Sequence, residues 1–220
     1  MYYQQYLDSA RRVRELVVPL DDEVLDRLTP ACPDWSVRDI VAHLSGAAAS
    51  FGTESFAGVG TDPWTRDHVE SRRGLALLEV LAEREECAPR LLSLPADSPG
   101  WLPVVHDALT HEADIRGAIG APQLPADVLA AAFGLIERTL PRQLSRLGNV
   151  EIVVDGQPMQ LGDGAPELVV DTRMFEFWRG WFGRRSPAQL RSWVRTGDAA
   201  AFAEALPVFR ARDTDLIESA

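Results

Sequence analysis

The chain has 220 residues, with 33 Asp and Glu against 22 Lys and Arg, so its formal net charge is −11. This charge argues against nucleic acid as a partner, because clustered Lys and Arg drive binding to phosphate backbones. No run of eighteen apolar residues and no basic start followed by an apolar stretch is present, so we expect no transmembrane helix, signal peptide or membrane partner. The two cysteines, Cys32 and Cys87, are too few for a disulfide framework, which predicts a cytoplasmic protein.

Helical periodicity dominates the first 120 residues. Proline punctuation predicts a loop over 29–35, and Ser36 with Asp39 resembles a capping box at the start of the next helix. Gly74 and Pro89 are unfavourable within a helix and are expected to interrupt the helix predicted over 65–94. A loop is expected over 95–100. The predicted helices are 2–18, 22–28, 36–50, 65–94 and 103–119. Their four principal members and the loops between them predict an antiparallel four-helix bundle.

The pattern changes after Ala121. A further helix is predicted over 127–147, followed by a hairpin in which Ile152–Val154 leads into the Asp155–Gly156 turn. Another strand is expected over 168–171, and helices over 174–183 and 187–196. The sequence therefore predicts a mainly α protein with a small α+β part. We place the first domain at residues 1–122 and the second at residues 123–220.

Ionisable side chains interrupt the apolar face of the helix predicted over 103–119. Asp107, His111 and Asp114 share that face, at spacings of four and three residues. Burying a carboxylate costs several kcal/mol unless it is paired, hydrogen-bonded or bound to a metal. This row therefore requires a partner in the interior, and a divalent cation is the sharpest candidate.

Asp107 and His111 lie one helical turn apart, with Cβ atoms about 6 Å apart, so both can reach one ion. Imidazole and carboxylate suit zinc and other first-row divalent ions. The alternatives are an Asp–His hydrogen bond within the helix or pairing with an arginine from another helix. Asp114 could orient His111 or assist substrate binding. It could also form an ion pair, with Arg11, Arg12 or Arg116 as the available partners.

The remaining histidines and Cys32 give weaker signals. His43 flanks the apolar stripe of its helix, where it is either a hydrogen-bonded boundary residue or a third ligand. His106 points about 140° away from His111 on a helical wheel and is not expected to join the same site. His68 lies in a polar run and is expected to be solvated. Cys32 precedes the His43 helix, where a packing role is favoured over nucleophilic catalysis.

Positive charge is concentrated in a short segment near the C-terminus. This segment could hold a small anion, although a solvated helix face is the more common explanation. The arginines concerned are Arg173, Arg179, Arg184, Arg185, Arg191 and Arg195.

Three segments together resemble a known family. The first, 29–46, reads TPACPDWSVRDIVAHLSG; the second, 107–120, reads DALTHEADIRGAIG; and the third, 175–198, reads FEFWRGWFGRRSPAQLRSWVRTGD. They resemble the mycothiol-dependent maleylpyruvate isomerase family, one of the DinB-like metalloproteins. The resemblance implies a DinB-like antiparallel four-helix bundle followed by a sterol-carrier-like α+β domain.

The resemblance also implies site residues. By position, His43, Asp107 and His111 are the metal ligands, and zinc is the usual ion. Asp114 then acts from behind the ligands, while Arg184 or Arg185 receives a carboxylate of the cofactor or substrate. One departure matters, because the isomerases of the family typically carry Glu at the position of Asp107, and Asp is one methylene shorter.

The implied function is that of a metal-dependent enzyme using a low-molecular-weight thiol, with mycothiol as the family's thiol. In such an enzyme the metal-stabilised thiolate attacks an electrophilic carbon of a small substrate, giving S-transfer or cis–trans isomerisation. Two alternatives remain open: a zinc-water hydrolase, and a non-catalytic small-molecule-binding DinB-like protein. The expected partners are the thiol and the substrate, and the expected state is a monomer or homodimer.

Overall fold

The computed structural model describes residues 2–51, 58–93 and 100–218. The chain divides into two compact units, the first extending to Leu124 and the second beginning at Pro125. The boundary expected from the sequence lies two residues earlier, between residues 122 and 123. Among the described residues, no helix is long and apolar enough to cross a membrane.

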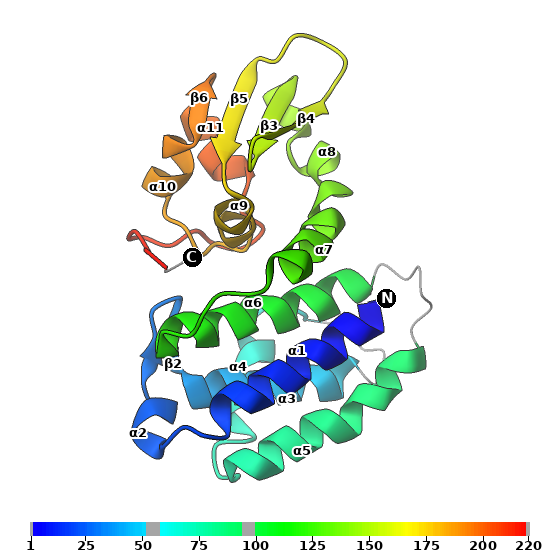
Figure 1. The fold of residues 1–220 in the computed structure, drawn as a ribbon, viewed down its shortest axis with the longest axis vertical. Helices are drawn as coiled ribbons and strands as arrows, with labels where there is room; N and C mark the ends of the chain where they lie inside the picture. The colour runs from blue at the N-terminus through cyan, green and yellow to red at the C-terminus, as the bar shows by residue number, and fades with distance from the viewer. Residues whose placement is uncertain (1, 52–57, 94–99, 219–220) are drawn as a thin grey trace. The chain divides into compact units, whose positions relative to one another are not determined.

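Four long helices form the first unit (Figure 1): α1 (Tyr2–Val17), α3 (Val37–Phe51), α5 (Leu77–Cys87) and α6 (Trp101–Ile119). Helix α1 packs on α6, and α3 packs on both α5 and α6. The core between them is almost entirely aliphatic, as the periodicity predicts. Its members include Val13, Val17, Val37, Ile40, Val41, Leu44, Val80, Leu81 and Ile115.

Helix α3 begins where the sequence predicts, at a capping box. The Ser36 hydroxyl accepts a hydrogen bond from the Asp39 amide at 3.1 Å, and the Asp39 carboxylate accepts one from the Ser36 amide at 2.9 Å. This reciprocal pair satisfies two backbone donors at the helix start.

The loop expected over 29–35 is instead a small hairpin of β1 (Leu28–Thr29) and β2 (Cys32–Ser36), which follows the short helix α2 (Asp22–Leu25). The Thr29 hydroxyl stabilises it by donating to the carbonyls of Cys32 and Trp35. Local proline signals indicate the turn but do not reveal this pairing.

The helix predicted over 65–94 is three separate pieces. They are α4 (Asp62–Glu70), α5 and the 3-10 helix η1 (Ala88–Ser93). The first break falls at 71–76, around Gly74, and the second falls just before Pro89. Both interruptions thus occur where glycine and proline disfavour a continuous α-helix. The predicted loop at 95–100 lies almost wholly outside the described residues.

The second unit contains a four-stranded sheet in the order β4-β3-β5-β6. Strands β3 (Val150–Val154) and β4 (Gln157–Leu161) form the predicted hairpin, with Asp155 and Gly156 both at positive φ. This pair of left-handed residues matches the twist that a two-residue hairpin turn requires. Strand β5 (Leu168–Thr172) pairs parallel to β3, at the predicted position.

Several helices of this unit are shorter than predicted. The helix expected over 127–147 comprises α7 (Ala126–Glu137), α8 (Leu140–Gln143) and the 3-10 turn η2 (Ser145–Leu147), because Pro141 cannot continue α7.

The helix expected over 187–196 also ends early. It stops as α10 (Pro187–Ser192), and the following β6 (Val194–Thr196) pairs with β5. Helix α9 (Met174–Trp181) agrees with its prediction, whereas α11 (Ala199–Ala205) was not predicted.

Candidate metal site

Three of the predicted site residues converge in the interior of the first unit. His43 comes from α3, and Asp107 and His111 come from successive turns of α6. The Asp107 Oδ1 atom lies 3.1 Å from His43 Nε2 and 3.8 Å from His111 Nε2. One ligand atom from each of the three residues lies within 4.8 Å of the other two. We call His43, Asp107 and His111 the first triad.

The spacing of the first triad fits a divalent ion. Nitrogen and oxygen ligands bound at about 2.0–2.1 Å to one tetrahedral ion lie about 3.3 Å apart. The two separations from Asp107 Oδ1, 3.1 and 3.8 Å, bracket that value. His43 is almost fully buried, whereas one fifth of the Asp107 side chain remains exposed. The shorter Asp107 side chain therefore reaches both histidines.

Asp114 lies behind the first triad. Its Oδ2 atom is 3.1 Å from His111 Nδ1, and its side chain is fully buried. A His111 that donates from Nδ1 to this carboxylate keeps the lone pair of Nε2 for an ion, which is how carboxylates commonly orient metal-binding histidines. The arginine partners considered for Asp114 are engaged elsewhere.

Those arginines bind other carboxylates. Arg12 and Arg116 both bind Glu112, and Arg11 binds Asp8.

His68 belongs to this site, and the prediction that it is solvated is wrong. It is buried on α4, with its Nδ1 3.4 Å from His43 Nδ1 and its Nε2 2.9 Å from Ser50 Oγ. A Cβ atom placed on Gly46 would lie 2.4 Å from the His68 ring, so glycine makes room for this contact. The sequence contains one indication that His68 is buried: Trp64 lies four residues before it, and aromatic residues at this spacing share a helix face.

The contacts of His43 and His68 imply one set of proton positions when His43 Nε2 faces an ion. His43 then carries its proton on Nδ1 and donates to His68 Nδ1, and His68 donates from Nε2 to the Ser50 hydroxyl. Each histidine of the first triad is thus backed by one residue: Asp114 behind His111, and His68 behind His43.

Two tryptophans surround the imidazoles. The Trp35 ring centroid lies 4.9 Å from that of His43 and 5.6 Å from that of His111. Trp64 lies edge-on, 5.6 Å from His43 and 4.1 Å from His68. These rings restrict the rotation of the imidazoles and reduce the access of water.

Burial and charge compete at the first triad. Burial raises the pKa of Asp107, but the positive charges of protonated His43 and His111 and the His43 hydrogen bond outweigh it, so the pKa is lowered overall. Burial lowers the pKa of His111 despite its hydrogen bond to Asp114. Burial, followed by the charge of His43, lowers the pKa of His68 to about 4. The lowered pKa values favour an ionised Asp107 and a neutral His111, the forms in which these side chains bind cations.

Cys32 is also near, and its contact is more specific than the packing role expected. The thiol on β2 is 3.3 Å from Asp114 Oδ2 and donates a hydrogen bond to it. Asp114 therefore connects Cys32 to His111. His106, in contrast, belongs to neither group of potential metal ligands among the described residues, as its direction on the helix predicts.

The predicted anion-binding arginines lie in the second unit. The guanidinium of Arg185 is fully buried and binds the carboxylates of Glu176 and Glu218. Arg184 donates from Nη1 to the carbonyl of Phe182 at 2.8 Å. These contacts give Arg185 a structural role that the sequence did not reveal, because its acidic partners lie 9 and 33 residues away. A role for either arginine in binding a thiol or substrate stays a prediction.

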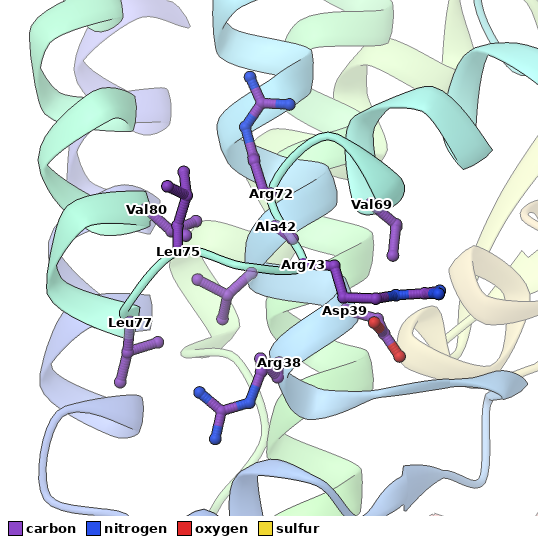
Figure 2. Close-up of a pocket in the computed structure, with 10 residues that line it drawn as sticks. Arg38, Asp39, Ala42, Val69, Arg72, Arg73, Leu75, Leu77 and Val80 are labelled. Carbon is purple, nitrogen blue, oxygen red and sulfur yellow. The ribbon is translucent and has the colours of Figure 1, made fainter.

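A separate pocket lies on the first unit and does not include the first triad (Figure 2). It is lined by apolar side chains and by Arg38, Asp39, Arg72 and Arg73. Arg38 already binds Asp22 and Asp26, and Arg72 binds Glu83. These pairings leave little of the positive charge of Arg38 and Arg72 for a ligand.

The fold and the site define a class of protein: a helical bundle with two histidines and a carboxylate gathered between α3 and α6, followed by an α+β unit. Within that class, residues 6–105 match the family model described as the mycothiol maleylpyruvate isomerase N-terminal domain. This match confirms the family resemblance and includes the first of its three motifs, 29–46. His43 lies inside the matched residues, whereas Asp107 and His111 follow them.

One solved structure supports the fold. A crystal structure of a histidine-to-alanine mutant of the mycothiol-dependent maleylpyruvate isomerase is 12% identical and superposes with a TM-score of 0.50, covering 83% of this chain and 88% of that one. A crystal structure of the mycothiol-dependent maleylpyruvate isomerase gives a TM-score of 0.49 at the same identity and coverage. No curated protein is similar enough in sequence to count as a match. The predicted fold class, a helical bundle followed by an α+β unit, is confirmed.

Proposed function

We propose that this protein is a metal-dependent enzyme that uses a small thiol, with mycothiol as the first candidate, on an electrophilic substrate. The observation that carries the proposal is the convergence of His43, Asp107 and His111 in a chain whose N-terminal residues match the mycothiol maleylpyruvate isomerase model. The reaction is either S-transfer or cis–trans isomerisation.

The first triad is the proposed binding site of the ion, with zinc as the first candidate because two imidazoles and one carboxylate form a common zinc donor set. Three protein ligands leave a coordination position open, as in catalytic rather than structural zinc sites. The ion, when bound, acts as a Lewis acid that stabilises a thiolate.

The protein residues orient and shield the site. Asp114 and His68 hold His111 and His43 from behind, so that both present Nε2 toward Asp107. Trp35 lies against both imidazoles and excludes water from that side. Asp107 remains ionised because its pKa is lowered, so it contributes a full negative charge to the donor set.

The charge of the donor set favours an anionic thiol. A divalent ion bound by one carboxylate and two neutral imidazoles carries a net positive charge. Binding of one thiolate neutralises this charge. Lowering the thiol pKa in this way raises the fraction of nucleophile at neutral pH. An attack on an activated carbon–carbon double bond then permits either retention of the thiol in the product or its loss after bond rotation.

Metal content provides the first test. Elemental analysis of purified wild-type protein should find zinc or another divalent ion, and His111→Ala should abolish its uptake. The matched control is His106→Ala, the same substitution five residues earlier on α6, which should retain the ion. Retention of the ion by His111→Ala with a folded helical spectrum would show that the proposed site is wrong.

Thiol consumption provides the second test. Wild-type protein with mycothiol and a panel of electrophiles, including maleylpyruvate, should consume thiol or isomerise substrate, and Asp107→Asn should not. Metal uptake with neither activity across the panel would contradict the thiol-dependent function. Full activity in the presence of a strong chelator would contradict its dependence on a metal.

A further inference from the structure

A second group of potential ligands adjoins the first triad and shares one residue with it. Cys32 on β2, Asp114 on α6 and His111, through its other ring nitrogen, place one ligand atom each within 4.8 Å of the other two. We call these three residues the second triad. It contains a sulfur ligand, which the first triad lacks.

The separations in the second triad match the edges of a thiolate-containing metal site. Bonds of about 2.3 Å to sulfur and about 2.0 Å to nitrogen or oxygen give tetrahedral edges near 3.5 Å for sulfur–oxygen and near 3.3 Å for nitrogen–oxygen. The measured Cys32 Sγ–Asp114 Oδ2 and His111 Nδ1–Asp114 Oδ2 distances are 3.3 and 3.1 Å. These two separations lie within about 0.2 Å of the ideal edges, and the ligand atoms of Cys32 and His111 lie within 4.8 Å of each other.

We propose that the second triad is a binding site for a thiophilic divalent cation, and that it competes with the first triad for the ring of His111. Thiolate ligands select soft ions such as Cd²⁺, whereas an all-nitrogen-and-oxygen set accepts harder ions such as Mn²⁺. Burial of His111 and Asp114 and partial exposure of Cys32 give the ion a low-dielectric site with one accessible ligand.

Proton accounting explains why the two triads exclude each other. An ion entering the second triad displaces the thiol proton of Cys32 to solvent and requires the lone pair of His111 Nδ1. The proton of the neutral imidazole then sits on Nε2, which faces Asp107 Oδ1 at 3.8 Å. A protonated Nε2 cannot bind an ion, so the first triad loses His111 as a ligand and each chain holds one ion.

The second triad is also electrically balanced for a divalent ion. A Cys32 thiolate and the Asp114 carboxylate together carry two negative charges, and the neutral imidazole adds none. A dication therefore leaves no net charge in this buried place, which reduces the cost of burying it. This inference does not depend on the proposed thiol-dependent function.

Titration of metal-free full-length protein with Cd²⁺ alone tests the proposal. We expect a sulfur-to-cadmium charge-transfer absorption that saturates at one ion per chain. Cys32→Ser should lose this absorption and bind Cd²⁺ at least about tenfold more weakly. The matched control is Cys87→Ser, because Cys87 is buried on α5 and belongs to neither triad.

Titration with Mn²⁺ separates the two triads. Asp107→Asn should lose Mn²⁺ affinity and retain the cadmium–thiolate absorption, whereas Cys32→Ser should do the reverse. His111→Ala should lose both. If wild-type protein does not bind Mn²⁺, the first triad is contradicted and the second triad is not. The experiment therefore tests the two proposed sites independently.

The proposal is overturned if wild-type protein shows no cadmium–thiolate absorption, or if Cys32→Ser retains it. Should Cys32→Ser fold poorly, the cadmium-113 resonance of the wild-type complex gives the same answer without a variant. A shift typical of sulfur ligation supports the second triad, and one typical of only nitrogen and oxygen ligands overturns it.

Discussion

Gly46→Ala is the sharpest perturbation of the histidine pair that supports the first triad. A Cβ atom at Gly46 would lie 2.4 Å from Cγ and 2.5 Å from Cβ of His68. Carbon atoms in contact normally lie about 3.5–4.0 Å apart, so His68 must recede by about 1 Å or more. Because the clash includes His68 Cβ, rotation of the ring cannot relieve it and α4 itself must move. The hydrogen bond from His43 Nδ1, now 3.4 Å long, is then lost.

Two opposing terms set the magnitude. Overpacking of this kind costs about 1–3 kcal/mol. Alanine has a better helix propensity than glycine, which stabilises the folded state by up to about 1 kcal/mol. We expect a net loss of about 1–2 kcal/mol in the free energy of unfolding. Because His43 also loses the residue that orients it, metal affinity should fall by about 10- to 100-fold.

The assays are urea unfolding of the metal-free protein and competition for zinc with a coloured chelator. Gly74→Ala is the matched control, because no atom lies within 4 Å of the position of its Cβ. It should leave metal affinity unchanged. His68→Ala removes the clashing ring, so Gly46→Ala should destabilise the His68→Ala background much less than the wild type. Additive effects of the two substitutions, or wild-type zinc affinity in Gly46→Ala, would refute the reasoning.

Three further predictions concern stability. Metal-free protein should lose stability as the pH falls below about 6.5. Burial lowers the folded-state pKa of His68 to about 4 and of His106 to about 3, whereas the same histidines in the unfolded chain take up protons near pH 6.5. A urea midpoint that is unchanged between pH 7 and pH 5 would contradict this. Glu112→Ala should cost about 3–5 kcal/mol in the same assay, since the fully buried carboxylate pairs with both Arg12 and Arg116; a loss below 1 kcal/mol would show that the network adds little. Asp198→Ala should cost about 1 kcal/mol, because this carboxylate accepts hydrogen bonds from two amides at the start of α11; no change in the urea midpoint would mean that solvent replaces the cap.

Local patterns in the sequence predict much of the fold. The capping box of Ser36 and Asp39 marks the start of α3, and the Asp155–Gly156 turn marks the β3–β4 hairpin, because both act within four residues. The spacing of Asp107 and His111 is likewise a property of one helix. Periodicity alone therefore predicts the ionisable face of α6.

Longer-range contacts account for the predictions that were wrong. The segment 194–196 becomes a strand only because β5 offers an edge to pair with, and no feature of 187–196 alone shows that edge. His68 appears solvated within its polar run, yet the space above Gly46 buries it against His43. In both cases the decisive partner lies more than 20 residues away in the chain.

Helical geometry alone places Asp107, His111 and Asp114 on one apolar face, so their spacing in the chain already shows that they require a partner. Which residues meet them there depends on the packing of distant segments. The tertiary structure brings His43 within 3.1 Å of Asp107 and the Cys32 thiol within 3.3 Å of Asp114. Burial and packing between distant segments select these contacts, and they divide one row of ionisable residues into two adjoining triads that share His111.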